Sequence, residues 1–334
     1  MKQCSLLTVA TLAVLLGSCQ NNDSLDSVVS QKFVHKYGFD LSPKEWEESP
    51  EDGQEVALLK NGVKITRSYE NGILHGPTTH TFPHKTTVEK CLVYDQGTLL
   101  KETIYDLQGM PIREEAYEYD DRMIVTLWDQ QGVPLSIEEY DGDILVDGKY
   151  FTTEHELDGK VENGFGERVK RDRSGLLISR DQIENGILVQ RTTYHPSGHV
   201  HTVSHYHDYQ LHGEQLKFTS IGRPLMRLCW NHGVLDGSKT IYRNGLKAAE
   251  IPYVGGEKHG TELRYDDLGN LTAEVLWRND KKHGCCKFYT EDSSESHWFF
   301  NGNSVTASKF ELLEEREQMI AEFNQMEEDA SITR

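Results

Sequence analysis

Three stretches of equal length decide the fold of this chain: Trp230-Asn-His-Gly-Val-Leu-Asp-Gly237, Tyr253-Val-Gly-Gly-Glu-Lys-His-Gly260 and Trp277-Arg-Asn-Asp-Lys-Lys-His-Gly284. A fourth copy runs from Tyr206 to Gly213, and the four closing glycines lie 24, 23 and 24 residues apart. A fixed period of this size indicates a repeat protein, in which each unit folds against its neighbours.

Each unit continues in the same way after its closing glycine. A second aromatic residue follows and then, except in the last unit, a turn glycine: Phe218 and Gly222, Tyr242 and Gly245, Tyr265 and Gly269, and finally Tyr289. Between these marks apolar and polar residues alternate, as in Leu271, Ala273 and Val275 ahead of Trp277. This alternation predicts half-buried strands, so one unit is an antiparallel hairpin. Because a single hairpin is only marginally stable, the units must stack.

The repeat extends well beyond these four units. It begins near Val56, and a copy with the same spacing starts at Tyr69. Over residues 94–140 aromatic residues recur every 11 or 12 positions, which fits one strand and one turn. Residues 141–185 are less regular and rich in glycine. We therefore predict an all-β repeat fold, an elongated antiparallel β-meander of hairpins over residues 56–305.

The C-terminal segment, residues 306–334, is expected to contain an amphipathic helix followed by a tail. The helix is predicted over residues 306–328. Ser308 and Glu311 have the spacing of a capping box. Apolar residues recur at helical spacing: Leu313, Ile320 and Phe323. We expect the helix to cap the last open edge of the sheet, which would otherwise expose unpaired backbone groups. Docking to a partner, as in a coiled coil, is the alternative.

The N-terminus has the features of a secretory signal. An apolar run of 11 residues, from Leu6 to Leu16, is too short to span a bilayer but suits the core of a signal peptide. The following Gly17-Ser18-Cys19 completes a stretch that resembles the bacterial lipobox, whose cysteine is acylated. The resemblance implies a lipoprotein signal peptide over residues 1–18, lipidation of Cys19 and attachment to the membrane through the N-terminal lipid. Gln20 after the cysteine resembles the sorting class of the Gram-negative outer membrane.

Composition limits the partners. The chain of 334 residues has a formal net charge of −19 at pH 7, which repels phosphates, so we expect no nucleic-acid partner. Six cysteines are too few for a disulfide framework, and the adjacent Cys285 and Cys286 are expected to be small strand residues. Residues 19–55 are predicted to form a polar tether whose later part, with Phe33 and Trp46, packs on the first repeat.

The Asn-Gly-x-x-His-Gly marks, with their aromatic and glycine positions, resemble the MORN repeat in the variant of bacterial YwqK-type proteins. The resemblance covers roughly residues 56–300 and is strongest at Tyr69–Gly76 and Tyr194–Tyr289. It implies an elongated antiparallel β-meander. Such proteins are often labelled as antitoxin components, and related repeats occur beside lipid kinases. Neither activity transfers, because the chain contains no recognisable kinase domain or toxin. Residues 94–140 also resemble the YD repeats of large shell-forming proteins.

No catalytic motif stands out from the repeat. The chain has no G-x-x-x-x-G-K-[ST] phosphate loop, no H-E-x-x-H and no G-x-S-x-G, so we expect neither enzymatic activity nor a cofactor. Histidine is the exception, because His199, His201, His205 and His207 share the outward face of one predicted strand. Such a stripe could bind Zn or Cu, or sense acid by charging near its ordinary pKa of about 6.5. The favoured interpretation is a set of solvated histidines without such a role.

Together these patterns predict an envelope-anchored lipoprotein whose body is a non-enzymatic β-repeat scaffold for protein–protein interaction. Its partner would be another envelope or secreted protein. Two alternatives stay open. One is an accessory subunit of an enzyme or an envelope hydrolase, which would need a pocket with convergent titratable groups. The other is a metal-binding or pH-sensing protein that uses the histidine stripe.

Overall fold

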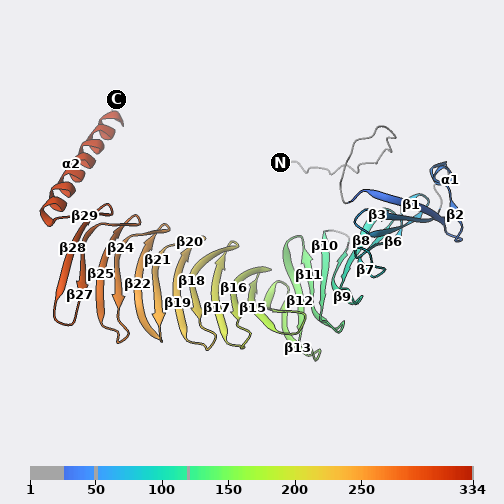
Figure 1. Cartoon of the computed structure of the whole chain (residues 1–334), viewed down its shortest axis with the longest axis horizontal. Helices are drawn as coiled ribbons and strands as arrows, with labels where there is room; N and C mark the ends of the chain where they lie inside the picture. The colour runs from blue at the N-terminus through green and yellow to red at the C-terminus, as the bar shows by residue number, and fades with distance from the viewer. Residues whose placement is uncertain (1–25, 49–51, 119–120, 333–334) are drawn as a thin grey trace. The chain divides into compact units, whose positions relative to one another are not determined.

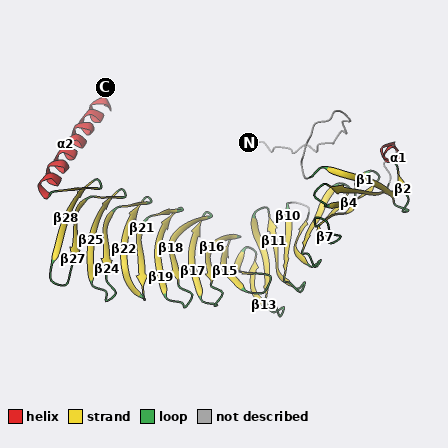
Figure 2. Cartoon of the chain, in the orientation of Figure 1, coloured by secondary structure: helices red, strands yellow, loops and turns green. Residues whose placement is uncertain are grey.

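The computed structural model describes residues 26–48, 52–118 and 121–332, so the predicted signal peptide and Cys19 lie outside the described residues. This part of the chain contains 29 strands and two helices, and the strand pairings are antiparallel (Figure 2). The predicted all-β meander of hairpins is confirmed. The described residues divide into two compact units, one up to residue 99 together with 107–109, and the other made of 100–106 together with the residues from 110 onward.

The first unit contains the early strands and a short helix. Its elements are β1 (Val28–His35), β2 (Asp40–Leu41), α1 (Pro43–Glu48), β3 (Gly53–Leu59), β4 (Lys64–Glu70), β5 (Ile73–Leu74), β6 (Gly76–Thr81), β7 (Val88–Asp95) and the start of β8 (Thr98–Tyr105). β1 pairs with β3, so the sheet extends into the segment expected to be a tether. Phe33 stacks on Trp46 at 5.0 Å, and Trp46 meets Tyr69 edge-on at 5.5 Å. These contacts attach the N-terminal segment to the first hairpin.

The second unit contains the remaining strands, which lie side by side in chain order (Figure 1). After β8 they are β9 (Pro111–Tyr117), β10 (Arg122–Trp128), β11 (Pro134–Asp141), β12 (Ile144–Phe151), β13 (Leu157–Glu162), β14 (Phe165–Arg171), β15 (Leu177–Glu184), β16 (Ile187–Tyr194), β17 (Val200–His207), β18 (Gln210–Phe218), β19 (Pro224–Asn231), β20 (Val234–Leu235), β21 (Gly237–Arg243), β22 (Leu246–Val254), β23 (Glu257–Lys258), β24 (Gly260–Tyr265), β25 (Leu271–Arg278), β26 (Lys281–Lys282), β27 (Gly284–Tyr289), β28 (Ser294–Phe300) and β29 (Asn303–Val305). Helix α2 (Ala307–Ile332) follows them.

The repeat marks have a structural reason. Each closing glycine lies directly opposite an aromatic residue of the next strand, in the pairs Gly213–Trp230, Gly237–Tyr253, Gly260–Trp277 and Gly284–Phe299. At Gly284 φ is +102°, and an added Cβ would lie 3.0 Å from the side chain of Leu276. A residue with a side chain rarely adopts this backbone conformation, so the position requires glycine. The period of the sequence thus arises because the same backbone geometry, a glycine paired with an aromatic residue of the next strand, recurs in each unit.

One core cluster of the second unit lies in the region that the sequence shows as irregular. Leu145, Tyr150, Val161, Val169 and Ile183 are each at most 4% exposed and form one cluster. Contacts also link strands that are not neighbours, since β14 meets both β11 and β12. The chain therefore bends at β12–β14, and we call this region the bend.

Three glycines make the bend possible. An added Cβ would lie 2.4 Å from the Tyr150 hydroxyl at Gly148, 2.5 Å from Val169 at Gly159, and 2.1 Å from the Lys160 carbonyl oxygen at Gly166. Contacts this short exclude any side chain, so the glycines leave the space that lets the strands close on one another.

Helix α2 was predicted correctly, but its cap was not. The helix begins at Ala307, and the Thr306 hydroxyl accepts a hydrogen bond from the Lys309 backbone N–H at 3.3 Å. The predicted capping box of Ser308 and Glu311 is wrong, because Ser308 already lies inside the first turn. A polar residue can cap a helix only from the position that precedes it, which here is Thr306.

The contact between α2 and the sheet involves the first half of the helix. Phe310 packs against Trp298 at 5.1 Å and Phe300 at 6.0 Å. Farther along, Met319 and Phe323 are each 62% exposed. The helix therefore covers the end of the sheet with its first turns, and its later apolar residues face solvent. Neither helix in the described residues is both long and apolar enough to cross a membrane.

Candidate functional site

The predicted histidine stripe lies on β17, with His199 just ahead of the strand. His201 and His207 are exposed and His205 is half-buried, whereas Ser204 between them is buried. Neighbouring stripe positions lie about 6.6 Å apart along a strand, yet the ligands of one zinc ion must approach it to about 2 Å. The stripe residues are therefore spread along the strand. His205 Nδ1 instead lies 2.7 Å from the carbonyl oxygen of Glu214.

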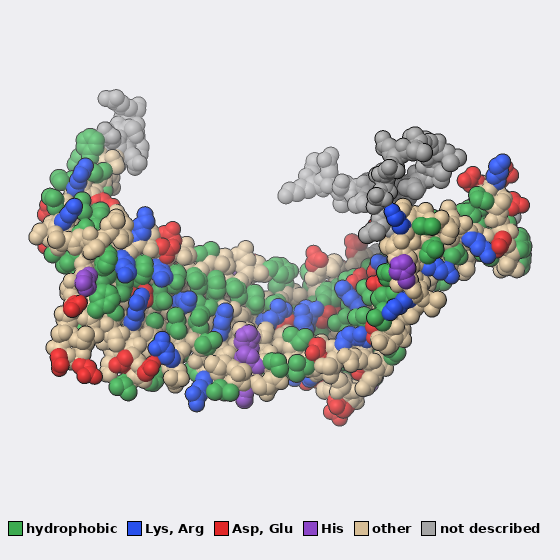
Figure 3. All heavy atoms as spheres, in the orientation of Figure 1, with side chains coloured by type: hydrophobic (Ala, Val, Ile, Leu, Met, Phe, Trp, Pro, Cys, Tyr) green, Lys and Arg blue, Asp and Glu red, His purple; other side chains and the backbone are tan. Residues whose placement is uncertain are grey.

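The stripe histidines meet histidines from other strands and turns. The rings of His195 and His201 are 4.3 Å apart, and His207 lies 5.6 Å from His212 and 5.8 Å from His232. Figure 3 shows histidine side chains gathered over the middle strands of the second unit. Sequence spacing missed His232, which reaches this group from the turn of the following repeat. The histidines therefore form two small groups rather than one stripe: His195 with His201, and His207 with His212 and His232.

One other group of possible metal ligands occurs among the described residues. Atoms of His283, Glu314 and Glu317 lie within 4.8 Å of one another where α2 meets the sheet. Arg278 forms ion pairs with Glu317 at 2.6 Å and with Glu314 at 3.7 Å. Arg278 thus already pairs with both carboxylates, His283 Nε2 lies 2.9 Å from Glu314, and the group joins helix to sheet.

The bend contains a buried charged network that the sequence did not reveal. Glu138 of β11 is 5% exposed. Its carboxylate accepts two hydrogen bonds from Arg168 of β14, at 2.6 and 2.8 Å. It accepts two more from the hydroxyls of Tyr140, at 2.7 Å, and Tyr150, at 2.9 Å. A bidentate guanidinium and two phenols thus satisfy the buried carboxylate, as a charge in this position requires.

This network shifts the titration of its members. Burial and the charge of Glu138 raise the pKa of the Tyr150 and Tyr140 hydroxyls. Although burial opposes a charged guanidinium, the hydrogen bonds and charge of Glu138 raise the pKa of Arg168. Arg168 therefore stays charged at every accessible pH.

A cavity of about 350 Å³ opens beside the network and is the candidate site. Strands β9–β11 form one wall with Arg113, Met123, Val125, Leu127, Leu135, Ser136, Glu138 and Tyr140, and β14–β15 form the other with Arg168, Val169, Lys170, Arg171 and Ile178. Its lining contains four cationic side chains in a chain of net charge −19. Burial, with the nearby charge of Arg168, lowers the pKa of Lys170. The cavity therefore differs in charge from the protein as a whole.

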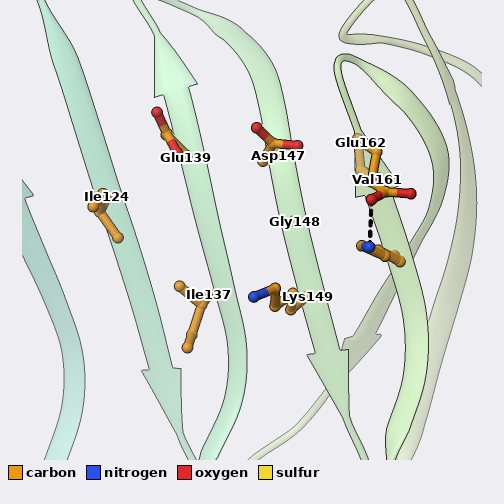
Figure 4. Close-up of a pocket in the computed structure, with 9 residues that line it drawn as sticks. Ile124, Ile137, Glu139, Asp147, Gly148, Lys149, Val161 and Glu162 are labelled. Atoms are coloured by element: carbon orange, nitrogen blue, oxygen red, sulfur yellow. Dashed lines mark hydrogen bonds and ion pairs between the residues drawn. The ribbon is translucent and has the colours of Figure 1, made fainter.

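A second hollow of about 420 Å³ lies on the opposite face of β10 and β11 and extends over β12 and β13 (Figure 4). Glu139 and Asp147 face each other there on neighbouring strands, and Glu162 bonds to Lys160. Ile137 and Lys149 lie below the carboxylates (Figure 4). Its lining contains three carboxylates and two lysines, and Glu139 also pairs with Arg122 at 3.1 Å. This hollow therefore has charges of both signs, without the cationic excess of the first cavity.

A titratable contact in the first unit gives a testable pH dependence. The Tyr69 hydroxyl donates to Glu55 at 3.0 Å. Burial and the charge of Glu55 raise the pKa of Tyr69 to about 12. Because this value exceeds the unfolded pKa of about 10, the stabilisation is complete below pH 10 and is lost as pH rises through 12.

Ionisation of tyrosine to phenolate can be followed by ultraviolet absorbance as the pH rises. When the titration curve of Tyr69→Phe is subtracted from that of the wild type, we expect the difference to show one group that ionises near pH 12 rather than near 10. The matched variant Glu55→Gln should move that ionisation back toward 10, because the negative charge is gone. A difference curve centred near 10 in the wild type would contradict the assignment.

Comparison with known proteins adds little to this geometry. No protein-family profile and no curated protein matches the chain. The crystal structure of TcdB2-TccC3-Cdc42 is 10% identical over 73% of this chain and 19% of its own, with a TM-score of 0.14. A porin-like protein from Bacteroides uniformis is 11% identical over 82% of this chain and 95% of its own, with a TM-score of 0.15. The chain thus spans 19% of the first of these chains, and both scores are too low to support a structural argument.

Proposed function

We propose that the protein is an envelope-anchored lipoprotein of the MORN-like, YwqK-type class, and that it acts as a non-enzymatic scaffold for a partner protein. One observation supports this most directly. At one edge of the sheet in the second unit, three consecutive hairpin turns each present an exposed apolar side chain. These are Ile221 (63% exposed), Leu246 (46%) and Leu268 (83%). We call them the turn row.

The turn row has the properties of a binding edge. Adjacent members are separated by two strands, or about 10 Å. Single exposed apolar residues are normal on proteins, but three of them at regular spacing along one edge give an extended partner a series of contact points. The face shown in Figure 3 also has a band of apolar side chains along these strands, bordered by charged ones. An extended surface of this kind suits a protein ligand.

Site-specific photo-crosslinking in intact cells tests the scaffold. A photoreactive residue placed at position 221, 246 or 268 should give the same discrete adduct. The matched control is Val254, which is 59% exposed at a turn on the opposite edge, and it should not give that adduct. The triple variant Ile221→Asp, Leu246→Asp, Leu268→Asp should abolish binding of the purified partner without loss of β-sheet signal. Equal adducts at both edges, or none, would contradict the proposal.

Lipid anchoring has a separate test, because Cys19 is the proposed acylation site. Cys19→Ser should move the protein from the membrane fraction to the soluble fraction, since acyl chains contribute about 0.8 kcal/mol per buried CH2 to membrane binding. Unchanged fractionation would reject the lipid anchor and leave the turn row untouched.

A further inference from the structure

The cavity beside the bend has two chemically distinct parts. One wall is apolar, with Val125, Leu127 and Leu135, of which Val125 and Leu135 are each 6% exposed. The other wall contains Arg168 and Lys170, which lie two residues apart on β14 and therefore share a face. An apolar pocket with a few convergent polar groups is the usual form of a small-molecule site.

The charges that line the cavity do not balance. Arg168 is neutralised by Glu138 at 2.6 Å, Arg171 by Asp158 at 2.5 Å and Arg113 by Glu115 at 2.6 Å. Lys170 has no hydrogen bond or ion pair with any residue that the structure describes. Asp181 is nearby, but Arg191 occupies both of its oxygens, at 2.8 and 2.7 Å. The cavity therefore has one cation without a partner, and a half-buried ammonium group favours an anion beside it.

We infer that this cavity binds an amphipathic monoanion, a carboxylate with a medium-length unbranched apolar chain. The carboxylate pairs with the amino group of Lys170. The chain lies along Val125, Leu127 and Leu135. Because Lys170 is the one cation without a partner, the ligand needs one negative charge. Because the facing wall is apolar, the rest of the ligand is a hydrocarbon chain rather than a second polar group. At about 350 Å³, the cavity is at the small end of ligand pockets, which excludes a long or branched lipid.

A ligand series on the full-length protein separates the two recognition elements. Decanoate has both of them, decanol has the chain without the charge, and acetate and inorganic phosphate have the charge without the chain. Decanoate should raise the thermal midpoint in a saturable way, because a ligand that binds the folded state stabilises it. The other three compounds should cause at most a small shift at the same concentration. An equal effect of phosphate or acetate would mean a simple anion site, and an equal effect of decanol would mean a simple apolar site. Either result overturns the inference.

Three variants assign the site. Lys170→Met removes the charge and leaves an unbranched side chain one atom shorter, so decanoate affinity should fall at least about tenfold. Lys149→Met makes the same change on the opposite face of the bend and should leave affinity unchanged. Ile178→Trp fills the cavity from a position that is 46% exposed, so it should fold normally and abolish binding with Lys170 intact.

The variants also distinguish a binding role from a structural one. If Lys170 serves a ligand, its unpaired charge opposes folding in the free protein, and Lys170→Met should raise the thermal midpoint while it removes the response to decanoate. If Lys170→Met lowers the midpoint, the lysine stabilises the bend and the inference fails. It fails equally if Lys170→Met and Lys149→Met bind decanoate with the same affinity.

Discussion

Replacing Glu138 with alanine is expected to destabilise the bend by about 3–5 kcal/mol, the usual cost of removing one partner of a buried ion pair. The side chain of Glu138 is 7% exposed and that of Arg168 is 22% exposed. The substitution leaves the guanidinium without its counter-ion, and the hydroxyls of Tyr140 and Tyr150 lose their acceptor. Buried groups without a partner account for most of the cost.

The measurement must be local, because a repeat array need not unfold in a single step. Amide hydrogen exchange is suitable, since it reports the opening free energy strand by strand. Protection should fall in β11 and β14, which hold the two ends of the ion pair. It should be unchanged in β24–β27, where Val275 and Cys286 form a separate core that is 0% exposed.

The neighbouring residue provides the control. Glu139 lies on the opposite face of the same strand, is 30% exposed and pairs with Arg122 at 3.1 Å. Glu139→Ala removes the same charge from the same strand, but it should change stability by no more than about 1 kcal/mol, as is usual for surface ion pairs. Equal effects of Glu138→Ala and Glu139→Ala would show that burial of the ion pair does not govern the stability of the bend.

A double substitution tests whether the cost comes from the unpaired charge. Glu138→Leu and Arg168→Met should each be destabilising alone, whereas the double variant should be more stable than either single one. Buried ion pairs can often be replaced by apolar residues of similar volume at little cost. A double variant with the summed loss of the two single ones would mean that the residues contribute independently.

The hairpins could be predicted from the sequence because their determinants are local. Leu271, Ala273, Val275 and Trp277 alternate along one strand, and Gly284 sits where the backbone takes a positive φ. Such features recur every two strands, so the period itself reports the fold. The capping residue of α2 was misassigned because Ser308 and Thr306 both suit a cap and lie two positions apart.

The bend and its cavity could not be predicted in this way. Glu138 and Arg168 are 30 residues apart, in a part of the chain without a clear period. In sequence, Glu138 and Glu139 are indistinguishable, and an acidic residue in a strand normally faces solvent. The available signal was the series of glycines at Gly148, Gly159 and Gly166, which remove side chains from neighbouring strands. Their density indicates close approach, but it does not indicate which charges become buried.

The second large effect is expected at Gly166. Its φ is +142°, and an added Cβ would lie 2.1 Å from the carbonyl oxygen of Lys160 on the paired strand β13. That oxygen belongs to the backbone and cannot move without displacing β13. Backbone strain at such a position costs about 1–3 kcal/mol. The steric clash adds to it, so Gly166→Ala should destabilise the bend by more than about 3 kcal/mol.

Gly198→Ala is the matched control, because Gly198 has a φ of +82° and no atom within 4 Å of an added Cβ. It should show the backbone strain alone, about 1–3 kcal/mol. Hydrogen exchange would measure each effect locally, in β13 and β14 for Gly166→Ala and in β16 and β17 for Gly198→Ala. Arg168 lies two residues beyond Gly166 on β14, so displacing this strand should also open the pair with Glu138 and abolish decanoate binding. If Gly166→Ala is as mild as Gly198→Ala and still binds decanoate, the side-chain network fixes the bend, and the close approach of the two backbones follows from it.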